Sequence, residues 1–116
     1  MQVDVTAERV ARNQSTFRAA NERIERRAEE LTVDRDAIPF ICECPEPTCR
    51  AIAKLSLVEY ETIRSRGDYF FAAPGHEVCV VDGQEVAKIA KRYEHFSVME
   101  KVGTAGEFAQ ELDPRR

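Results

Sequence analysis

The stretch FICECPEPTCR, residues 40–50, carries three of the four cysteines of this 116-residue chain within eight positions. Cys42 and Cys44 are two residues apart, so in an extended segment their side chains leave the same face of the backbone. The two prolines that follow exclude regular structure and shape a loop that can return Cys49 to the same point. Three thiolates supply most of a tetrahedral shell, and zinc is the ion most often held in this way. The stretch therefore predicts a domain whose fold is held together by a structural metal site.

Three residues elsewhere in the chain compete for the fourth ligand position. His76 follows a Pro-Gly turn at the end of a predicted strand, where a ligand is aimed with little rotamer freedom, and we favour it. Cys79 lies in the apolar stretch EVCVV and also fits a small core residue. His95 falls in a predicted turn, where a histidine is ordinarily exposed. The predicted metal ligands are Cys42, Cys44, Cys49 and His76, with Cys79 and His95 as alternatives to the histidine.

The metal predicted from this ligand set is Zn²⁺, with an iron–sulfur cluster as the alternative. The C-x-C start is similar to one class of [2Fe–2S] site with three Cys and one His, but the Cys-Asp-Gly-x-x-His ending of that pattern is absent from the sequence. Structural disulfides are disfavoured, because the N-terminal sequence lacks the apolar stretch of a signal peptide and a cytoplasmic location is expected. Glu43 and Glu46 either stay in water or orient the site from outside the ligand shell.

Length and composition predict one domain over residues 1–116, with an N-terminal helix in 1–36 and a metal-binding core in 37–116. Apolar residues make up 43% and charged residues 33% of the chain, an ordinary balance for a globular protein. The net charge of −4 argues weakly against nonspecific nucleic-acid binding. No apolar run approaches the ~20 residues that span a bilayer, so no contact with a membrane is expected.

Residues 6–32 contain no Gly or Pro and are predicted to form one long helix, with Thr6 as its N-cap. We expect the charged run NERIERRAEE to face solvent. Asn13 and Arg27 interrupt a coiled-coil seam, so packing on the chain's own sheet, and hence a monomer, is favoured over a helix-mediated dimer. The stripe expected to be buried recurs every seven residues at Val10, Phe17, Ile24 and Leu31.

The remaining sequence alternates short strands with short helices, which predicts an α+β fold with a small antiparallel sheet. A capping box, Ser56 to Glu59, opens a helix over 57–66 that Gly67 would end. Asp82-Gly83 marks a tight hairpin turn. A second capping box from Thr104 to Glu107 opens a C-terminal helix. Predicted strands cover 40–42, 50–55, 68–73, 86–93 and 95–102, although 85–96 also fits a helix.

These motifs resemble a group of small bacterial proteins, common in actinobacteria, to which no activity is assigned. Their shared pattern runs F-x-C-E-C … C … E-Y-E … P-G-H-E, and the resemblance covers most of this chain. It implies that the three cysteines and the histidine of the P-G-H segment form one metal site, which supports His76 over Cys79. The matching residues are Phe40, Cys42, Glu43, Cys44, Cys49, Glu59, Tyr60, Glu61, Pro74, Gly75, His76 and Glu77.

The function expected from this pattern is a noncatalytic zinc-binding module, most simply a regulatory domain that binds a protein partner. Four protein ligands close a zinc shell, whereas a catalytic zinc keeps an open position, and no H-E-x-x-H motif or phosphate-binding loop appears. One alternative is a thiolate redox or metal sensor. The other is a nucleic-acid-binding zinc domain with a basic and aromatic cluster. That cluster would consist of Lys88, Lys91, Arg92 and Lys101 around Tyr93 and Phe96.

Overall fold

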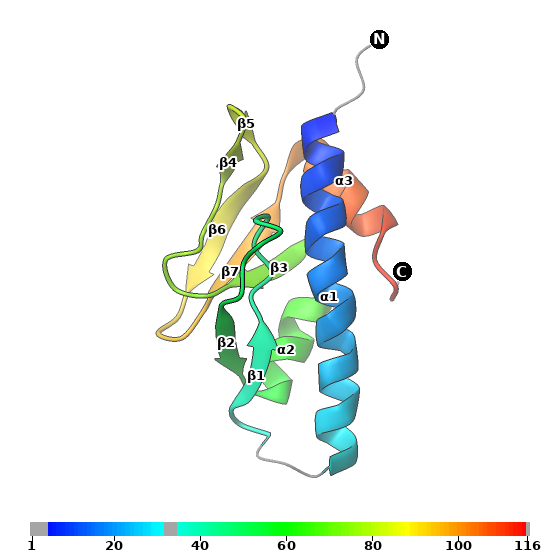
Figure 1. Cartoon of the computed structure of the whole chain (residues 1–116), viewed down its shortest axis with the longest axis vertical. Coiled ribbons are helices and arrows are strands. Elements are labelled where there is room, and N and C mark those ends of the chain that lie inside the picture. Colours follow the sequence, from blue (N-terminus) through cyan, green and yellow to red (C-terminus); the bar gives the residue numbers. More distant parts are fainter. Residues whose placement is uncertain (1–4, 32–34, 116) are drawn as a thin grey trace.

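The longest element is the helix α1, Val5–Leu31, which runs along most of the long axis of the molecule (Figure 1). The computed structural model describes residues 5–31 and 35–115. The predicted long helix is confirmed, but Thr6 lies inside α1 and is not its N-cap. Its hydroxyl instead lies 3.4 Å from Asp82 Oδ2, and Arg9 forms an ion pair of 2.9 Å with the same carboxylate.

The buried face of α1 differs from the predicted apolar stripe. Val10 is buried, Phe17 and Ile24 are half-buried, and Leu31 is 54% exposed. A straight helix drifts by ~20° per heptad, so three heptads turn Leu31 roughly 60° away from Val10. The expectation that the charged run faces solvent is also partly wrong, because three of its polar residues are buried. The buried positions of α1 are Ala7, Val10, Ala11, Gln14, Arg18, Asn21, Glu22, Glu25 and Ala28.

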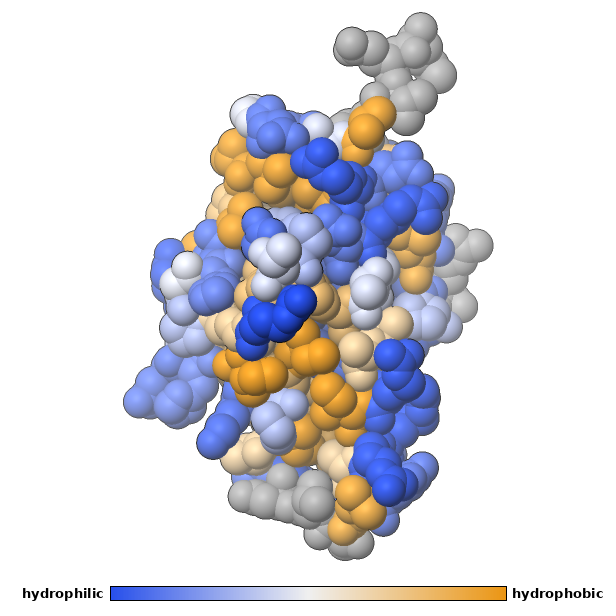
Figure 2. Space-filling view, in the orientation of Figure 1, coloured by the Kyte–Doolittle hydropathy of each residue, from blue (hydrophilic) through white to orange (hydrophobic). Residues whose placement is uncertain are grey.

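A two-stranded antiparallel sheet follows α1 and carries the cysteine loop at its tip. Strand β1, Ile38–Ile41, pairs with β2, Ile52–Leu55, and the CPEPTC segment between them has no helix or strand. Both strands and the irregular loop were predicted, although Pro39 lies within β1 and Cys42 follows it. Figure 2 shows apolar side chains gathered over these strands and the adjoining part of α1, where Ile52 is 52% exposed.

The helix α2, Leu57–Arg64, begins with the predicted capping box. The amide of Glu59 donates to Ser56 Oγ over 3.0 Å, and the amide of Ser56 donates to Glu59 Oε1 over 2.7 Å. Gly67 does not end this helix, because Ser65 is its C-cap. A Cβ at Gly67 would lie 2.7 Å from Asp113 Oδ2, so this glycine allows a close approach of the C-terminal segment.

A three-stranded antiparallel sheet forms the second half of the chain, in the order β3-β7-β6. These strands are β3, Tyr69–Ala72, β7, Ser97–Lys101, and β6, Ala87–Arg92, so the helical alternative for 85–96 is wrong. The small hairpin of β4, Val80–Val81, and β5, Gln84–Glu85, turns at Asp82 and Gly83. Their φ values of 52° and 77° are those of the hairpin turn predicted from the Asp-Gly pair.

The C-terminal helix α3, Gly103–Glu111, packs against α1 and β7. Its N-cap is Val102 and has no side-chain cap, so the predicted capping box at Thr104 is wrong. Gly106 lies on the packed face of α3, where a Cβ would come within 2.8 Å of the Lys101 carbonyl oxygen. The helix α3 therefore begins without a side-chain cap and approaches the backbone of β7 closely.

An aromatic trio joins the two halves of the core. Phe40 of β1 stacks on Tyr60 of α2 with ring centroids 4.4 Å apart, and Phe71 of β3 meets both rings edge-on at 6.2 Å. The chain thus has the predicted α+β fold, with a long N-terminal helix, small antiparallel sheets and short helices. No helix among residues 5–31 and 35–115 combines the length and the apolar character needed to cross a membrane.

Candidate metal centre

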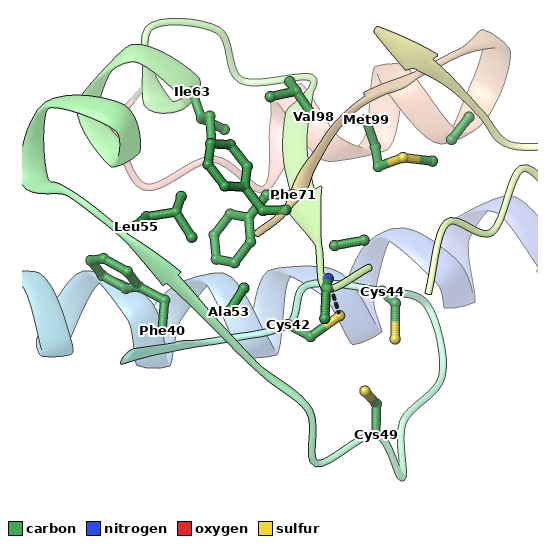
Figure 3. Close-up of a cluster of buried hydrophobic side chains, with 14 of the residues drawn as sticks. Phe40, Cys42, Cys44, Cys49, Ala53, Leu55, Ile63, Phe71, Val98 and Met99 are labelled. Carbon is green, nitrogen blue, oxygen red and sulfur yellow. Dashed lines mark hydrogen bonds between the residues drawn. The ribbon is translucent and has the colours of Figure 1, made fainter. Parts of the chain in front are cut away.

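Four side chains converge where the cysteine loop meets the end of β3. The ligand atoms of Cys42, Cys44, Cys49 and His76 all lie within 4.8 Å of one another. The three cysteines are buried and His76 is half-buried. Figure 3 shows the three thiols pointing toward one region at the edge of the apolar cluster. The structure thus brings together the four residues predicted from the sequence, in a group that could hold a metal ion.

Short backbone hydrogen bonds fix the two segments that carry these side chains. The Cys42 amide donates to the Ala51 carbonyl over 3.0 Å, and the Cys49 amide donates to the Glu46 carbonyl over 3.1 Å, which closes the loop. On the other segment, the His76 amide donates to the Ala73 carbonyl over 2.9 Å. This bond closes a turn over residues 73–76, with Pro74 at the second position and Gly75 at the third. The φ of 86° at Gly75 is the positive value that the third position of a type II turn requires. The Pro-Gly pair therefore aims His76 at the loop.

Hydrogen bonds within the group distribute the thiol protons unevenly. A hydrogen bond from Cys42 lowers the pKa of Cys44 to about 5. The same bond, together with burial, raises the pKa of Cys42. Burial also raises the pKa of Cys49, whose sulfur lies 3.5 Å from His76 Nδ1. Without a cation the group therefore favours one thiolate among protonated neighbours, and a bound metal ion would displace the remaining thiol protons.

The spacing of the donor atoms fits a tetrahedral metal ion. Zinc bonds of about 2.3 Å to sulfur place the ligand atoms of a tetrahedral shell roughly 3.8 Å apart. The separations in this group reach 4.8 Å at most, so small side-chain movements would close the shell. The amide of Ala73 also donates to Cys42 Sγ over 3.2 Å, drawn as the dashed line in Figure 3. Backbone donors of this kind stabilise a metal-bound thiolate.

The two alternative ligands lie outside this group. Cys79 is half-buried at the start of the β4–β5 hairpin, where its carbonyl accepts hydrogen bonds of 2.8 Å from Val86 and 3.3 Å from Ala87. His95 is exposed in the turn between β6 and β7, as a surface histidine would be. The structure therefore favours His76 as the partner of the three thiols.

Glu43 lies between Cys42 and Cys44 in the sequence and connects the group of candidate ligands to α1. Its side chain is 0% exposed, and Arg18 donates to both carboxylate oxygens over 2.8 Å. Arg18 also donates to the Tyr69 carbonyl over 2.6 Å and lies 4.1 Å above the Phe70 ring. Of the two predicted roles for Glu43, the structure supports orientation of the site. Glu46 is exposed and accepts hydrogen bonds from Thr48.

Two amide side chains extend this connection along the loop. The side chain of Asn21 accepts from the Ile41 amide and donates to the Ile41 carbonyl, both over 2.8 Å, so it pairs with the edge of β1 as a neighbouring strand would. Gln14 donates to the Glu43 carbonyl over 2.9 Å. Sequence reasoning missed these residues because it assigned the run NERIERRAEE, which contains Asn21, to solvent and gave Gln14 no role. The available signal was the spacing of Gln14, Arg18 and Asn21, which lie four and three residues apart on one helical face.

Comparison of the chain with protein-family models, with curated proteins and with solved structures found no match.

Proposed function

We propose that this chain is a noncatalytic zinc-binding module that acts as a regulatory protein-interaction domain. The observation that carries the proposal is the convergence of three buried thiols and one half-buried imidazole within 4.8 Å. Three Cys and one His form one of the usual ligand sets of structural zinc sites. Soft thiolates select zinc or iron–sulfur clusters over magnesium or calcium, which prefer oxygen ligands.

The ligand count supports a structural role for the metal. Cys42, Cys44, Cys49 and His76 would fill all four positions of a tetrahedral zinc ion, which leaves none for a water molecule or a substrate. The metal would tie the loop after β1 to the turn after β3. Through Glu43, Arg18 and Asn21 it would also hold α1 in place. Metal binding would therefore stabilise the packing of the helix on the rest of the chain.

Charge pairing on the sheet favours a protein partner over nucleic acid. Within the predicted basic and aromatic cluster, Lys101 is 2% exposed and Phe96 is 3% exposed, so neither offers a surface to a base or a phosphate. Lys88 lies 3.6 Å from Glu100, and Arg92 lies 3.6 Å from Glu77. Phosphate binding needs cations that are not already paired with carboxylates. The apolar side chains over β1, β2 and α1 are better suited to a protein surface.

Metal analysis of the purified protein tests the first half of the proposal. We expect about one zinc ion per chain, and replacement of zinc by cobalt should give the absorption bands of a tetrahedral thiolate site. A metal-free protein with an unchanged circular dichroism spectrum would refute the metal site. Iron and acid-labile sulfide after anaerobic purification would identify an iron–sulfur cluster instead.

Affinity capture with the zinc-loaded protein tests the second half, with the metal-depleted protein as the matched control. A partner retained only by the zinc-loaded form would support a regulatory interaction domain. Binding of nucleic acid that weakens steeply with salt would point to the nucleic-acid alternative. Zinc release by stoichiometric peroxide, reversed by a thiol reductant, would point to the sensor alternative.

A further inference from the structure

The side chain of Arg115, just beyond α3, lies among three carboxylates that come from two other helices. Its guanidinium donates to both oxygens of Glu22, over 2.7 and 3.0 Å, and to both oxygens of Glu61, over 3.2 and 2.8 Å. Nη2 also lies 2.9 Å from Glu25 Oε1. We name Glu22, Glu25 and Glu61 the acidic socket. Two bidentate pairs around one planar cation form a site matched to the shape of a guanidinium group.

Buried neighbours hold the acidic socket in shape. The hydroxyl of Tyr60 donates to Glu22 Oε2 over 2.8 Å, and Arg64 Nη2 lies 3.2 Å from Glu22 Oε1. Tyr60 is 0% exposed, and the side chain of Arg64 is likewise 0% exposed. Arg64 also pairs with Asp113 over 2.6 Å. Glu22 is therefore oriented by groups other than Arg115, so the shape of the socket does not depend on Arg115 alone.

Glu25 is the least satisfied member of the socket even with Arg115 in place. The Glu25 side chain is only 7% exposed, and its buried Oε2 receives no hydrogen bond from the described residues. Burial, together with the neighbouring Glu61 carboxylate, raises the pKa of Glu25 to about 8. A hollow of about 320 Å³ opens beside it and is lined by Glu22, Glu25, Arg26, Pro114 and Arg115. With a pKa of about 8, Glu25 keeps its proton at neutral pH. Hydrogen bonds from Arg115 lower the pKa of Glu61 and, against the effect of burial, that of Glu22, so these two carboxylates supply the negative charge that a guanidinium group meets.

Exchange of the ligand is possible because one side of the socket faces solvent. The Arg115 side chain is 35% exposed and that of Glu61 is 51% exposed. Besides the contacts of its side chain, Arg115 donates a hydrogen bond of 2.9 Å from its backbone amide to Asp113 Oδ1. Lifting this residue would uncover Glu22 and Glu25 while Tyr60 and Arg64 keep their places.

We infer that the acidic socket is an arginine-binding site, which Arg115 fills within the chain and which an arginine side chain of a partner peptide fills when Arg115 moves away. The inference extends the proposed interaction function by naming the chemistry of the partner. Arginine fits because its planar fork can pair with two carboxylates at once, whereas the ammonium group of lysine is a point donor. Arg115 acts as an intramolecular competitor whose effective concentration is on the order of millimolar.

The test uses the full zinc-loaded chain with Arg115→Ala and the probe acetyl-Pro-Arg-amide, followed by titration calorimetry. We expect the variant to bind this probe about tenfold or more tightly than the wild type does, because the competitor is gone. Acetyl-Pro-Lys-amide should bind the variant roughly tenfold more weakly than the arginine probe. Adding Glu61→Gln to the variant should weaken binding, whereas Glu29→Gln, on the exposed part of α1, should not.

Three results would overturn the inference: no binding of the arginine probe to a folded Arg115→Ala variant, equal binding of the arginine and lysine probes, or equal binding by variant and wild type. Circular dichroism and zinc content confirm folding, and Arg115→Lys serves as a second variant that keeps the charge. Zinc content is measured on the same samples, so failure of the socket is distinguished from failure of the metal proposal.

Discussion

Replacement of Arg18 by methionine is the sharpest test of how α1 is held on the cysteine loop. Methionine keeps most of the length and the apolar stem of arginine, so it isolates the loss of the guanidinium group. The change removes two hydrogen bonds of 2.8 Å to Glu43 and one of 2.6 Å to the Tyr69 carbonyl. Glu43 would remain buried, with a hydrogen bond of 3.0 Å from Asn21 and one of 3.4 Å from the Phe71 amide.

The size of the effect follows from burial of both partners. The Arg18 and Glu43 side chains are 3% and 0% exposed, so neither charge can turn to water when its partner is removed. Removal of one member of such a pair typically costs ~3–5 kcal/mol, because it leaves an uncompensated buried charge. This is a large share of the ~5–15 kcal/mol that stabilises an ordinary domain. A urea m-value of about 1.5 kcal/mol/M converts this loss of stability to a midpoint shift of roughly 2–3 M.

Urea denaturation followed by circular dichroism, with zinc in excess, measures this shift. Arg12→Met is the matched control, because Arg12 pairs with Glu8 on the exposed side of the same helix, with 62% of its side chain accessible. Exposed pairs of this kind contribute ~0.3–0.5 kcal/mol, so the control should stay near the wild type. Adding Glu43→Gln to Arg18→Met should recover at least ~1 kcal/mol, because it removes the unpaired charge. Equal midpoints for Arg18→Met and Arg12→Met would refute the role assigned to the buried pair.

Three further outcomes are expected. Cys44→Ala should abolish stoichiometric zinc binding and lower the melting temperature sharply, whereas Cys79→Ala should keep the zinc, because Cys79 lies outside the group of three cysteines and His76. Metal analysis and thermal melts of both variants measure this difference. Equal losses of zinc and of melting temperature would place Cys79 among the metal ligands. Burial raises the pKa of Glu25 from 4.5 to about 8, so the stability that protonated Glu25 contributes is fully present below pH 4.5 and is lost as pH rises through 8. In Glu25→Gln the unfolding free energy should fall less over this pH range. Parallel pH profiles of the unfolding free energy for variant and wild type would contradict the pKa shift. Phe17→Ala should lower the unfolding free energy by less than the ~3–5 kcal/mol typical of a fully buried aromatic, because Phe17 is half-buried. Sedimentation of the wild type over a wide concentration range should show a monomer. A dimer that Phe17→Asp dissociates would instead make α1 an assembly surface.

Features set by short stretches of chain were predictable from the sequence. The turn at Asp82-Gly83 needs two residues with positive φ, and few residue pairs adopt that conformation readily. The capping box at Ser56 and Glu59 is closed by bonds between residues three apart. The spacing of Cys42, Cys44 and Cys49 gathers the thiols within one loop, and the Pro-Gly turn aims His76. In each case the interacting groups are near one another in sequence, or the backbone has few alternatives.

Only the tertiary structure decided which face of α1 is buried. Arg18 is separated from Glu43 by 25 residues and Glu22 from Arg115 by 93, so helical periodicity contains no information about either pair. A charged side chain can be buried only where a distant partner offsets its desolvation, and sequence patterning therefore assigns it to solvent by default. Sequence patterning likewise could not predict the close approach of Asp113 to Gly67, or that of α3 to the backbone of β7, because these residues are brought together only by the tertiary fold. The sequence by itself determined the turns of this protein and the group of three cysteines and one histidine that could hold a metal ion, while long-range pairing of buried charges decided how the long helix is fixed to them.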